Sequence, residues 1–205
     1  ISMFDEDYKK LEKILVRMDD EDYFYQCIKS DPEHVNVFGK FRKKNDPVFA
    51  ADQRSKYFKY QGVGLDVFSL EKSNRFAAHM AKFLYQNLIH PTQYIKNRFW
   101  RHFAIKSVQL LNFGLLIPLC RLIGRINHKG QYRYKLGSGF YQCGFSAEDI
   151  LPLRTMEFEG IEFPVPGNTD AYLTKIYGDW RKLPSEEQIR KTMHYPLYIK
   201  EIFGE

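Results

Sequence analysis

The first apolar residues of the chain recur every three or four positions, the spacing that places side chains on one face of a helix. They are Phe4, Tyr8, Leu11, Leu15 and Met18. Ser2 stands three positions before Asp5, as in a capping box that closes a helix N-terminus. We therefore predict a first helix over residues 4–18.

Two β-prone segments follow, over residues 23–28 and 34–43, with a turn at Ser30-Asp31-Pro32-Glu33 between them. Because side chains alternate along a strand, Lys40 and Arg42 would share one face of the second strand. The polar residues 44–60 predict a loop.

A third strand is predicted over residues 62–70, and it carries one carboxylate in mostly apolar sequence. Asp66 would share a face with Gly62 and Gly64, which leave open space that a ligand could approach. Burying such a carboxylate is costly unless a cation or hydrogen-bond donors pair with it. Two interpretations stay open here: a ligand site, or a structural Asp that accepts hydrogen bonds at a strand end.

Residues 73–125 have helical periodicity. We predict one helix that Pro91 ends, a second over 92–111 and a third over 115–126. The apolar run 108–123 raises the question of a membrane span, but it is interrupted by polar residues and is shorter than the roughly 20 apolar residues that a span needs. The pattern favours a buried helical layer, with an interfacial amphipathic helix as the alternative.

The remaining sequence predicts a glycine-rich loop, a hairpin and two helices. Gly137-Ser138-Gly139 is a weak candidate for wrapping a phosphate. Residues 155–158 and 161–163 alternate around Glu159-Gly160, as in a hairpin with a tight turn. Asn168 or Thr169 would cap a helix that Gly178 ends, and a second capping box at Ser185–Gln188 would open a last helix towards His194.

Charge is unevenly distributed over these elements. The chain has 205 residues, a net charge of +6 and a pI near 9.1, which favours anionic partners such as phosphates, nucleic acid or lipid headgroups. Residues 1–22 are acidic, whereas residues 96–135 are rich in Lys and Arg. The basic stretch is either a contact surface or a solvated helix face.

The three cysteines, Cys27, Cys120 and Cys143, are too few and too far apart for a disulfide framework or a zinc site. They are typical of buried thiols in a reducing compartment. The chain opens without a signal-peptide pattern, so we expect a cytoplasmic protein.

Several sequence words resemble the LicD family of phosphorylcholine transferases and, more distantly, the catalytic domain of fukutin-related proteins. They are KFRKKN, GVGLDVFSLE, EFEGIEFPVP, DAYLTKIYGDW and KLPSEEQ, in consistent order from residue 1 to about residue 195. The resemblance implies an α+β fold: a nucleotidyltransferase-like mixed sheet flanked by helices. It would form a single domain over 1–205, with a sheet core in 1–72, a helical insertion in 73–127, and a loop, hairpin and C-terminal helices in 128–205.

The resemblance also assigns a metal site. In the family, a glycine pair and an aspartate-rich P-W-D-D-D-I-D-I word bind divalent metal together with a later aspartate in a D-I-F-P-L-D setting. Asp66-Val67-Phe68-Ser69-Leu70-Glu71 matches that later word, apart from Ser69 and Glu71. Asp66 is thereby assigned as a catalytic and metal-binding carboxylate for Mg²⁺ or Mn²⁺.

The glycine pair and the first aspartates of the family are not found in the sequence given. Residues 1–8 look like what directly follows the aspartate word, so we expect the rest of the metal site to precede Ile1. Asp5, Glu6 and Asp7 do not replace it, because carboxylates at a helix start suit the macrodipole and face water.

The implied reaction is transfer of a phosphorylated small alcohol, such as phosphocholine, from a CDP-linked donor such as CDP-choline to a hydroxyl of a cell-surface or lipid-linked glycan. Lys40 and Arg42 would bind the donor phosphates, unless they are exposed strand-edge charges. His194 is a conceivable general base, although a structural role is the simpler interpretation. The basic helices would permit peripheral membrane contact.

Two alternatives stay open: a non-catalytic polyanion- or glycan-binding module, and a nucleotidyltransferase on the same fold. No nucleic acid is expected as a partner, since basic and aromatic residues do not interleave along a recognisable nucleic-acid-binding motif.

Overall fold

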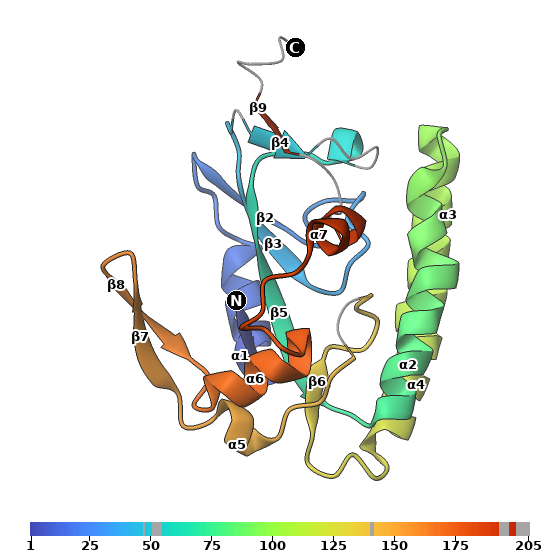
Figure 1. Cartoon of the computed structure of the whole chain (residues 1–205). Helices are drawn as coiled ribbons and strands as arrows, with labels where there is room; N and C mark the ends of the chain where they lie inside the picture. Colours follow the sequence, from blue (N-terminus) through green and yellow to red (C-terminus); the bar gives the residue numbers. More distant parts are fainter. Residues whose placement is uncertain (47, 51–54, 140–141, 193–196, 200–205) are drawn as a thin grey trace.

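The computed structural model of the chain describes residues 1–46, 48–50, 55–139, 142–192 and 197–199 (Figure 1). A mixed sheet occupies the centre, with helices on either side of it. The α+β class, the mixed sheet and its helical flanks are therefore confirmed.

The sheet is built around β5 (Gly64–Lys72), its longest strand. The strand order is β1-β5-β3-β2, with β1 at Ser2–Phe4, β2 at Tyr23–Gln26 and β3 at Gly39–Lys43. A fifth strand, β6 (Tyr132–Tyr134), also pairs with β5. Only β1 runs parallel to β5, whereas β3 and β6 pair with it in antiparallel fashion.

The register of these pairs fixes which residues become neighbours. Lys40 of β3 lies opposite Asp66 of β5, and Arg42 lies opposite Gly64. Leu70 is paired with both Phe4 of β1 and Tyr134 of β6, so β1 and β6 lie on opposite edges of β5.

Helix α1 (Asp5–Leu15) covers one face of the sheet through Tyr8, which packs with Tyr25, Cys27 and Val67. The predicted helix over 4–18 is thus confirmed with shorter ends. The predicted capping box is wrong, because Ser2 belongs to β1 and the N-cap is Phe4, which has no side-chain cap. Strand pairing with β5 satisfies the backbone here instead.

The second predicted strand also starts later than expected, at Gly39 instead of His34. Side chains of the preceding turn bind the backbone there: the Ser30 hydroxyl accepts from the Cys27 amide, and the Asp31 carboxylate accepts from the Glu33 amide. These local hydrogen bonds hold the turn before His34, and residues 34–38 form no strand.

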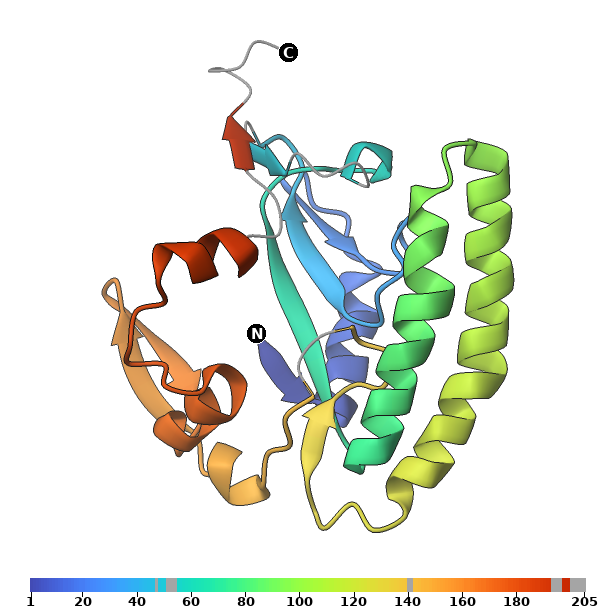
Figure 2. The ribbon, with the colours of Figure 1, turned by 45° about the vertical axis from the view of Figure 1, so that its right-hand side comes forward.

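Between β5 and β6 the chain forms two long helical arms that lie side by side (Figure 2). The first consists of α2 (Arg75–Leu84), a π turn η2 (Tyr85–Ile89) and a 3-10 turn η3 (His90–Tyr94). The second consists of α3 (Arg98–Leu111), a π turn η4 (Asn112–Leu116) and α4 (Ile117–Arg125).

Two predictions about these helices are wrong. Pro91 does not end the first arm, since it occupies the first turn of η3, where its missing N–H is not needed. The break falls at residues 95–97, and Asn97 caps α3 by accepting from the Trp100 amide. The predicted second and third helices are one continuous helix, because the π turn at 112–116 carries the chain across.

A buried apolar cluster with several small residues holds the two arms together. Ala77, Ala81, Ile117 and Cys120 form a buried cluster, and a Cβ on Gly124 would lie only 3.3 Å from that of Ala77. The expected buried layer is nonetheless wrong for most of the second arm, because only the face towards α2 and the sheet is covered. Many apolar side chains of its other face are exposed.

The C-terminal part confirms its predicted elements. The hairpin of β7 (Arg154–Phe158) and β8 (Ile161–Val165) turns at Glu159 and Gly160, both with positive φ. Helix α6 (Thr169–Tyr177) is capped by Asn168, and α7 (Glu186–Thr192) begins with the expected reciprocal bonds between Ser185 and Gln188. A short α5 (Ala147–Ile150) precedes the hairpin.

The segment predicted as a loop over 44–60 contains some regular structure. Strand β4 (Val48–Ala50) pairs with β9 (Leu197–Ile199), and a 3-10 turn η1 spans Ser55–Tyr57. This pairing joins residues far apart in sequence, which is why local composition does not predict it.

Candidate functional site

The central feature of the site is an ion pair between two neighbouring strands. Lys40 Nζ of β3 lies 2.7 Å from Asp66 Oδ1 of β5, with side chains that are 19% and 29% exposed. The pair follows directly from the register, because directly opposite side chains of antiparallel strands lie on the same face and within reach. The cation that Asp66 was expected to require is therefore Lys40.

Asp66 is incompletely satisfied by this contact. Its Oδ1 is buried and accepts no hydrogen bond from the described residues, so the contact with Lys40 is ionic without hydrogen-bond geometry. Asp66 also lies within β5 and not at its end. The ion pair with Lys40 accounts for the partial burial of Asp66, and its role as a ligand-binding residue stays a prediction.

Arg42 lies on the same face as Lys40 but makes different contacts. Its Nε donates to Gln26 Oε1 and its Nη1 donates to the Gly62 carbonyl, both at 2.6 Å, and its guanidinium lies over the Phe58 ring. Since β3 is an inner strand and Arg42 is buried, the alternative of exposed strand-edge charges is wrong. These bonds tie the guanidinium to Gln26 of β2 and to Gly62 just before β5.

A cavity of about 300 Å³ opens beside Asp66. Its wall includes Ile1 and Ser2 of the β1 end, Phe68 of β5, Tyr134 of β6, and residues of α6, namely Tyr172, Leu173, Ile176 and Tyr177. The main-chain nitrogen of Ile1 donates to the Asp66 carbonyl at 2.8 Å, so the start of β1 lies directly beside the carboxylate-bearing residue. One carboxylate therefore shares a cavity with four aromatic rings.

The aromatic wall is held in place by its own contacts. Phe68 packs edge-on against Tyr134, the Tyr172 ring stacks on Phe145, and the hydroxyls of Tyr134 and Tyr172 lie 3.2 Å apart. Burial, together with the nearby Tyr172, raises the pKa of Tyr134 above its ordinary value. Tyr134 thus stays protonated at neutral pH and contributes a rigid, neutral surface.

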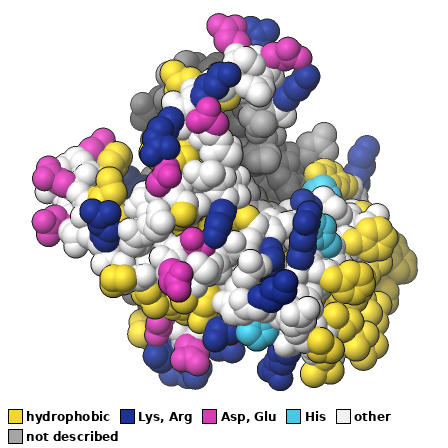
Figure 3. All heavy atoms as spheres, turned by 60° about the horizontal axis from the view of Figure 1, so that its bottom comes forward, with side chains coloured by type: hydrophobic (Ala, Val, Ile, Leu, Met, Phe, Trp, Pro, Cys, Tyr) yellow, Lys and Arg dark blue, Asp and Glu magenta, His cyan; other side chains and the backbone are white. Residues whose placement is uncertain are grey.

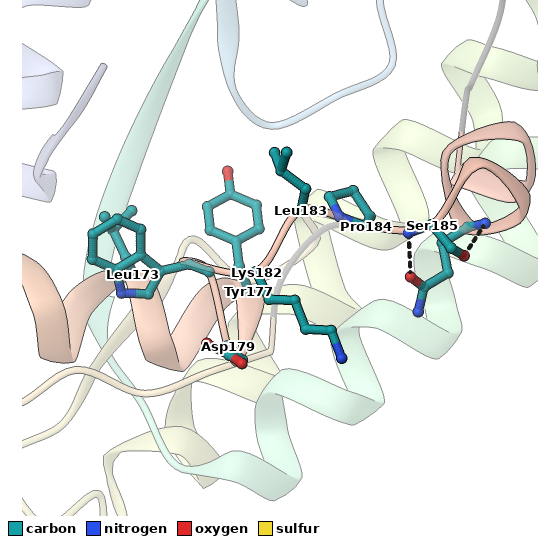
Figure 4. A pocket seen from close by; sticks show the side chains of 9 residues that line it. Leu173, Tyr177, Asp179, Lys182, Leu183, Pro184 and Ser185 are labelled. Carbon is teal, nitrogen blue, oxygen red and sulfur yellow. Dashed lines mark hydrogen bonds between the residues drawn. The ribbon is translucent and has the colours of Figure 1, made fainter.

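A larger cavity of about 880 Å³ follows the segment from α6 to α7 and shares Leu173 and Tyr177 with the first (Figure 4). Gly178 ends α6 with a φ of 72°, a conformation that favours glycine. Tyr177 and Leu183 project to one side of the segment, whereas Asp179 and Lys182 project to the other. The tyrosine-glycine-aspartate word therefore forms the boundary between the two cavities.

The described residues provide only part of a metal site. They contain no group of three or more His, Cys, Asp or Glu side chains arranged to hold a metal ion. Asp66, with its buried and unbonded Oδ1, fits the role of one ligand, but an ion held by one carboxylate would keep most of its coordination for water.

Asp5 corrects another expectation, because it does not face water. Its carboxylate lies 2.5 Å from Lys9 Nζ and 3.4 Å from Lys135 Nζ, and it accepts a 2.9 Å hydrogen bond from Ser69. Burial opposes ionisation, but Lys9, Lys135 and Ser69 outweigh it and lower the pKa of Asp5. Asp5 lies on the α1 side of the sheet and does not join Asp66.

The glycine-rich word has a packing role. A Cβ on Gly139 would lie 2.6 Å from the Tyr85 ring, and one on Gly137 would lie 3.2 Å from Val37, so both glycines permit close packing. Ser138 between them is buried. His194 lies outside the described residues.

Sequence reasoning found Asp66 and Lys40 but missed the aromatic wall supplied by Tyr134, Tyr172 and Tyr177. The signal in the sequence is the word Tyr177-Gly178-Asp179, which carries the family resemblance and contributes Tyr177 to this wall. Comparison of the chain with protein-family models, curated proteins and solved structures finds no match.

Proposed function

We propose that this chain belongs to a LicD-type transferase. It would move a phosphorylated small alcohol, in the first instance phosphocholine, from a CDP-linked donor to a hydroxyl of a cell-surface or lipid-linked glycan, with Mg²⁺ or Mn²⁺ as the metal. The proposal rests on the sequence words around Asp66 and Tyr177-Gly178-Asp179 and is supported by their meeting at neighbouring cavities.

The observation that carries the proposal is the shared cavity of Asp66 and the aromatic residues. Quaternary ammonium groups are bound by the faces of aromatic rings through cation–π attraction. Tyr134, Tyr172 and Tyr177 line the cavity beside Asp66, so a choline group would find rings and a carboxylate together. The cavity volume of about 300 Å³ lies at the lower end of the range for small-ligand sites.

The strand arrangement is compatible with the proposed nucleotidyltransferase-like site. Because β1 runs parallel to β5 and begins beside Asp66, any residues that precede Ile1 would enter along β5 next to this carboxylate. The aspartate word that the resemblance places there would then complete the metal site.

Each residue of the pair has a proposed role. Lys40 would release Asp66 when the donor binds and would donate its ammonium hydrogens to the donor phosphate oxygens. Asp66 would become a ligand of the divalent metal, which when bound neutralises phosphate charge and stabilises the leaving group. Arg42, fixed by Gln26 and Gly62, would hold β2, β3 and the loop before β5 in position.

Mass spectrometry of the whole natural protein, incubated with CDP-choline and candidate glycans, tests the reaction. We expect a phosphocholine mass increment on the glycan that requires Mg²⁺ and is lost in Asp66→Asn. Asp19→Asn, which changes an exposed carboxylate near the end of α1, is the matched control and should keep full activity. Turnover by Asp66→Asn at the normal rate would overturn the proposal.

Donor choice tests the aromatic wall. Tyr177→Leu should weaken binding of CDP-choline by roughly fivefold or more while leaving CDP-glycerol, which has no cation, unchanged. Phe158→Leu on the distant hairpin is the control. Equal loss for both donors would show that Tyr177 does not recognise the ammonium group.

The same assays distinguish the two alternatives. Nucleotidyl transfer would release pyrophosphate from a nucleoside triphosphate and leave CDP-choline intact. A non-catalytic binding module would bind glycan equally well with and without Mg²⁺ and would be unaffected by Asp66→Asn.

A further inference from the structure

The second helical arm, residues 98–125, exposes an apolar stripe that Lys106 interrupts. We call it the outer stripe; it consists of Phe99, Phe103, Leu110, Leu115, Leu119, Leu122 and, just beyond the helix, Ile126. Phe99 is 69% exposed and Leu110 is 77% exposed, values unusual for such large apolar side chains. Figure 3 shows hydrophobic side chains gathered at this side of the molecule, with Lys, Arg and His at their border.

The π turn keeps the stripe on one side of the helix. Leu110 and Leu115 are five positions apart. In a regular α-helix five residues make well over one full turn, so the two side chains would lie on different faces. The turn η4 at Asn112–Leu116 has the wider i→i+5 hydrogen bonding, which brings residues five apart back into line. The stripe therefore runs along the whole arm, about 40 Å at the usual rise per residue.

The opposite face of the arm is occupied by the protein itself. Ile105, Ile117 and Cys120 are buried against the rest of the fold. Near the start of the arm, Arg101 donates from Nε and Nη2 to both oxygens of Glu33, at 2.8 and 2.9 Å. The arm is thus fixed to the rest of the fold by its inner face, and the outer stripe is exposed in the folded protein.

The segment that carries the stripe has charged side chains of one sign only. The sequence contains no Asp or Glu between Glu71 and Glu148. Exposed cations lie at both ends and in the middle of this segment: Lys72, Arg75, Lys96, Arg98, Lys106, Arg125 and Lys129. An aromatic and aliphatic stripe bordered by Lys and Arg is the pattern of a helix that lies in a membrane interface with anionic lipids.

We propose that the outer stripe binds the surface of a bilayer containing anionic phospholipid, with the 98–125 arm lying in the plane of the interface. Phe99 and Phe103 would enter the acyl boundary, and Lys106 between them and Leu110 would extend its ammonium to the headgroups. Nothing in this surface involves Asp66, so the inference goes beyond the proposed function and stands independently of it.

A membrane-spanning arrangement fits the structure less well. Among the described residues, Arg98–Arg125 is the one helix long and apolar enough to cross a membrane, and 28% of its most apolar window is buried in the protein. Spanning would pull Arg101 from Glu33 and expose the buried Gln109 and Asn112 to lipid, both costly steps.

Docking of a second copy is also disfavoured. Two outer stripes placed face to face would bring Lys106 and the flanking cations of both copies together. The segment has no acidic residue that could neutralise them. Like charges in contact oppose association, whereas an anionic bilayer attracts all of them.

Co-flotation with vesicles tests the proposal. The 205-residue chain should bind vesicles of phosphatidylcholine mixed with phosphatidylglycerol and bind pure phosphatidylcholine at least about tenfold more weakly. Phe99→Ser with Phe103→Ser should reduce binding by on the order of a hundredfold. The matched control is Phe158→Ser with Phe163→Ser, which removes two exposed phenylalanines from the β7–β8 hairpin and should leave binding unchanged.

Charge reversal and fluorescence complete the test. Lys106→Glu should weaken binding to the mixed vesicles by roughly tenfold, whereas Lys13→Glu on α1 should not. The chain has two tryptophans, so Trp180→Phe leaves Trp100 beside the stripe as the reporter. Its emission should shift to the blue when mixed vesicles are added.

Three outcomes would overturn the proposal. They are equal binding to both vesicle types, equal loss in the stripe and hairpin variants, and a lipid-free dimer that the stripe substitutions dissociate. The last would assign the stripe to contact between copies. Because none of these readouts uses donor or glycan, failure here leaves the proposed transferase activity untouched, and failure of that activity leaves this surface untouched.

Discussion

The sheet region around Asp66 and the 98–125 arm use the same kinds of residues in opposite ways. In the sheet region, acidic side chains meet cations: Asp66 with Lys40, and Asp5 with Lys135. Aromatic rings of this region line a cavity. In the arm, the outward cations have no acidic residue within their own segment, and the large apolar side chains turn outward.

The difference indicates two kinds of binding. In an ion pair beside a cavity, each charge neutralises the other. A charged ligand can bind there by replacing one of the two partners. Unbalanced charge beside an exposed apolar stripe forms a surface whose complement is large, flat and anionic. We therefore propose a small polar donor as the ligand of the first region and a lipid surface as the partner of the second.

The largest effect on stability is expected at Arg101, a cation of the arm that is buried and, like the cations of the sheet region, paired with a carboxylate. Arg101→Ala would leave Glu33 buried without its bidentate partner, although His102 Nε2 lies 2.7 Å away. We expect a loss of about 3–5 kcal/mol in the free energy of unfolding, measured by urea denaturation. Arg98→Ala, an exposed cation of the same helix, should cost less than about 0.5 kcal/mol. Equal effects would remove the distinction between the inward and outward charges of the arm.

A second effect is expected at His34, which lies between the two regions. Its Nε2 contacts the Phe38 carbonyl at 2.7 Å, its own carbonyl accepts from Gln109, and burial lowers its pKa from 6.5 to about 4. Between these values the unfolded chain binds a proton that the folded chain does not. Stability is therefore full above pH 6.5 and falls as the pH drops from 6.5 towards 4.

At pH 5 this His34 contribution should amount to a loss of about 2 kcal/mol relative to pH 7. Urea denaturation at both pH values, compared with a His34→Gln variant, isolates it. We expect the variant to be less stable at pH 7 but less sensitive to pH. The same pH sensitivity in both proteins would show that other groups are responsible.

The Asp66–Lys40 pair should contribute little to stability, in contrast to Arg101–Glu33. Both side chains are partly exposed, and Oδ1 lacks a hydrogen bond, so a double-mutant cycle with Asp66→Asn and Lys40→Met should give about 1 kcal/mol or less. A coupling above about 3 kcal/mol would indicate a structural pair instead of an exchangeable one.

The smallest effect on folding is expected from the outer stripe. Phe103→Ser should change the free energy of unfolding by no more than about 0.5 kcal/mol. The ring is mostly exposed to solvent and packs against its neighbour Trp100. Thermal denaturation of the lipid-free chain measures this. A loss of about 3 kcal/mol would show that the ring belongs to the core.

Local signals predicted much of the fold. The periodicity of residues 4–18, the Glu159-Gly160 turn and the caps at Asn168 and Ser185 each act within a few residues, and the structure retains all of them. The β4–β9 pair and the role of Ser2 in β1 depend on contacts between distant segments. The continuous 98–125 helix depends on a π turn that its sequence does not mark.

The candidate site was predictable in part for the same reason. Alternation along the strands placed Lys40 and Arg42 on one face, but only the register with β5 brings Lys40 to Asp66 and leaves Arg42 beside Gln26. The aromatic wall is assembled from β5, β6 and α6, so no single stretch of sequence reveals it.

Donor binding by the whole natural protein tests the central claim most directly. Titration calorimetry with CDP-choline should show binding that is strengthened by Mg²⁺ and weakened about tenfold or more in Asp66→Asn, with Asp19→Asn unchanged. Affinity that depends neither on Mg²⁺ nor on Asp66 would contradict the account.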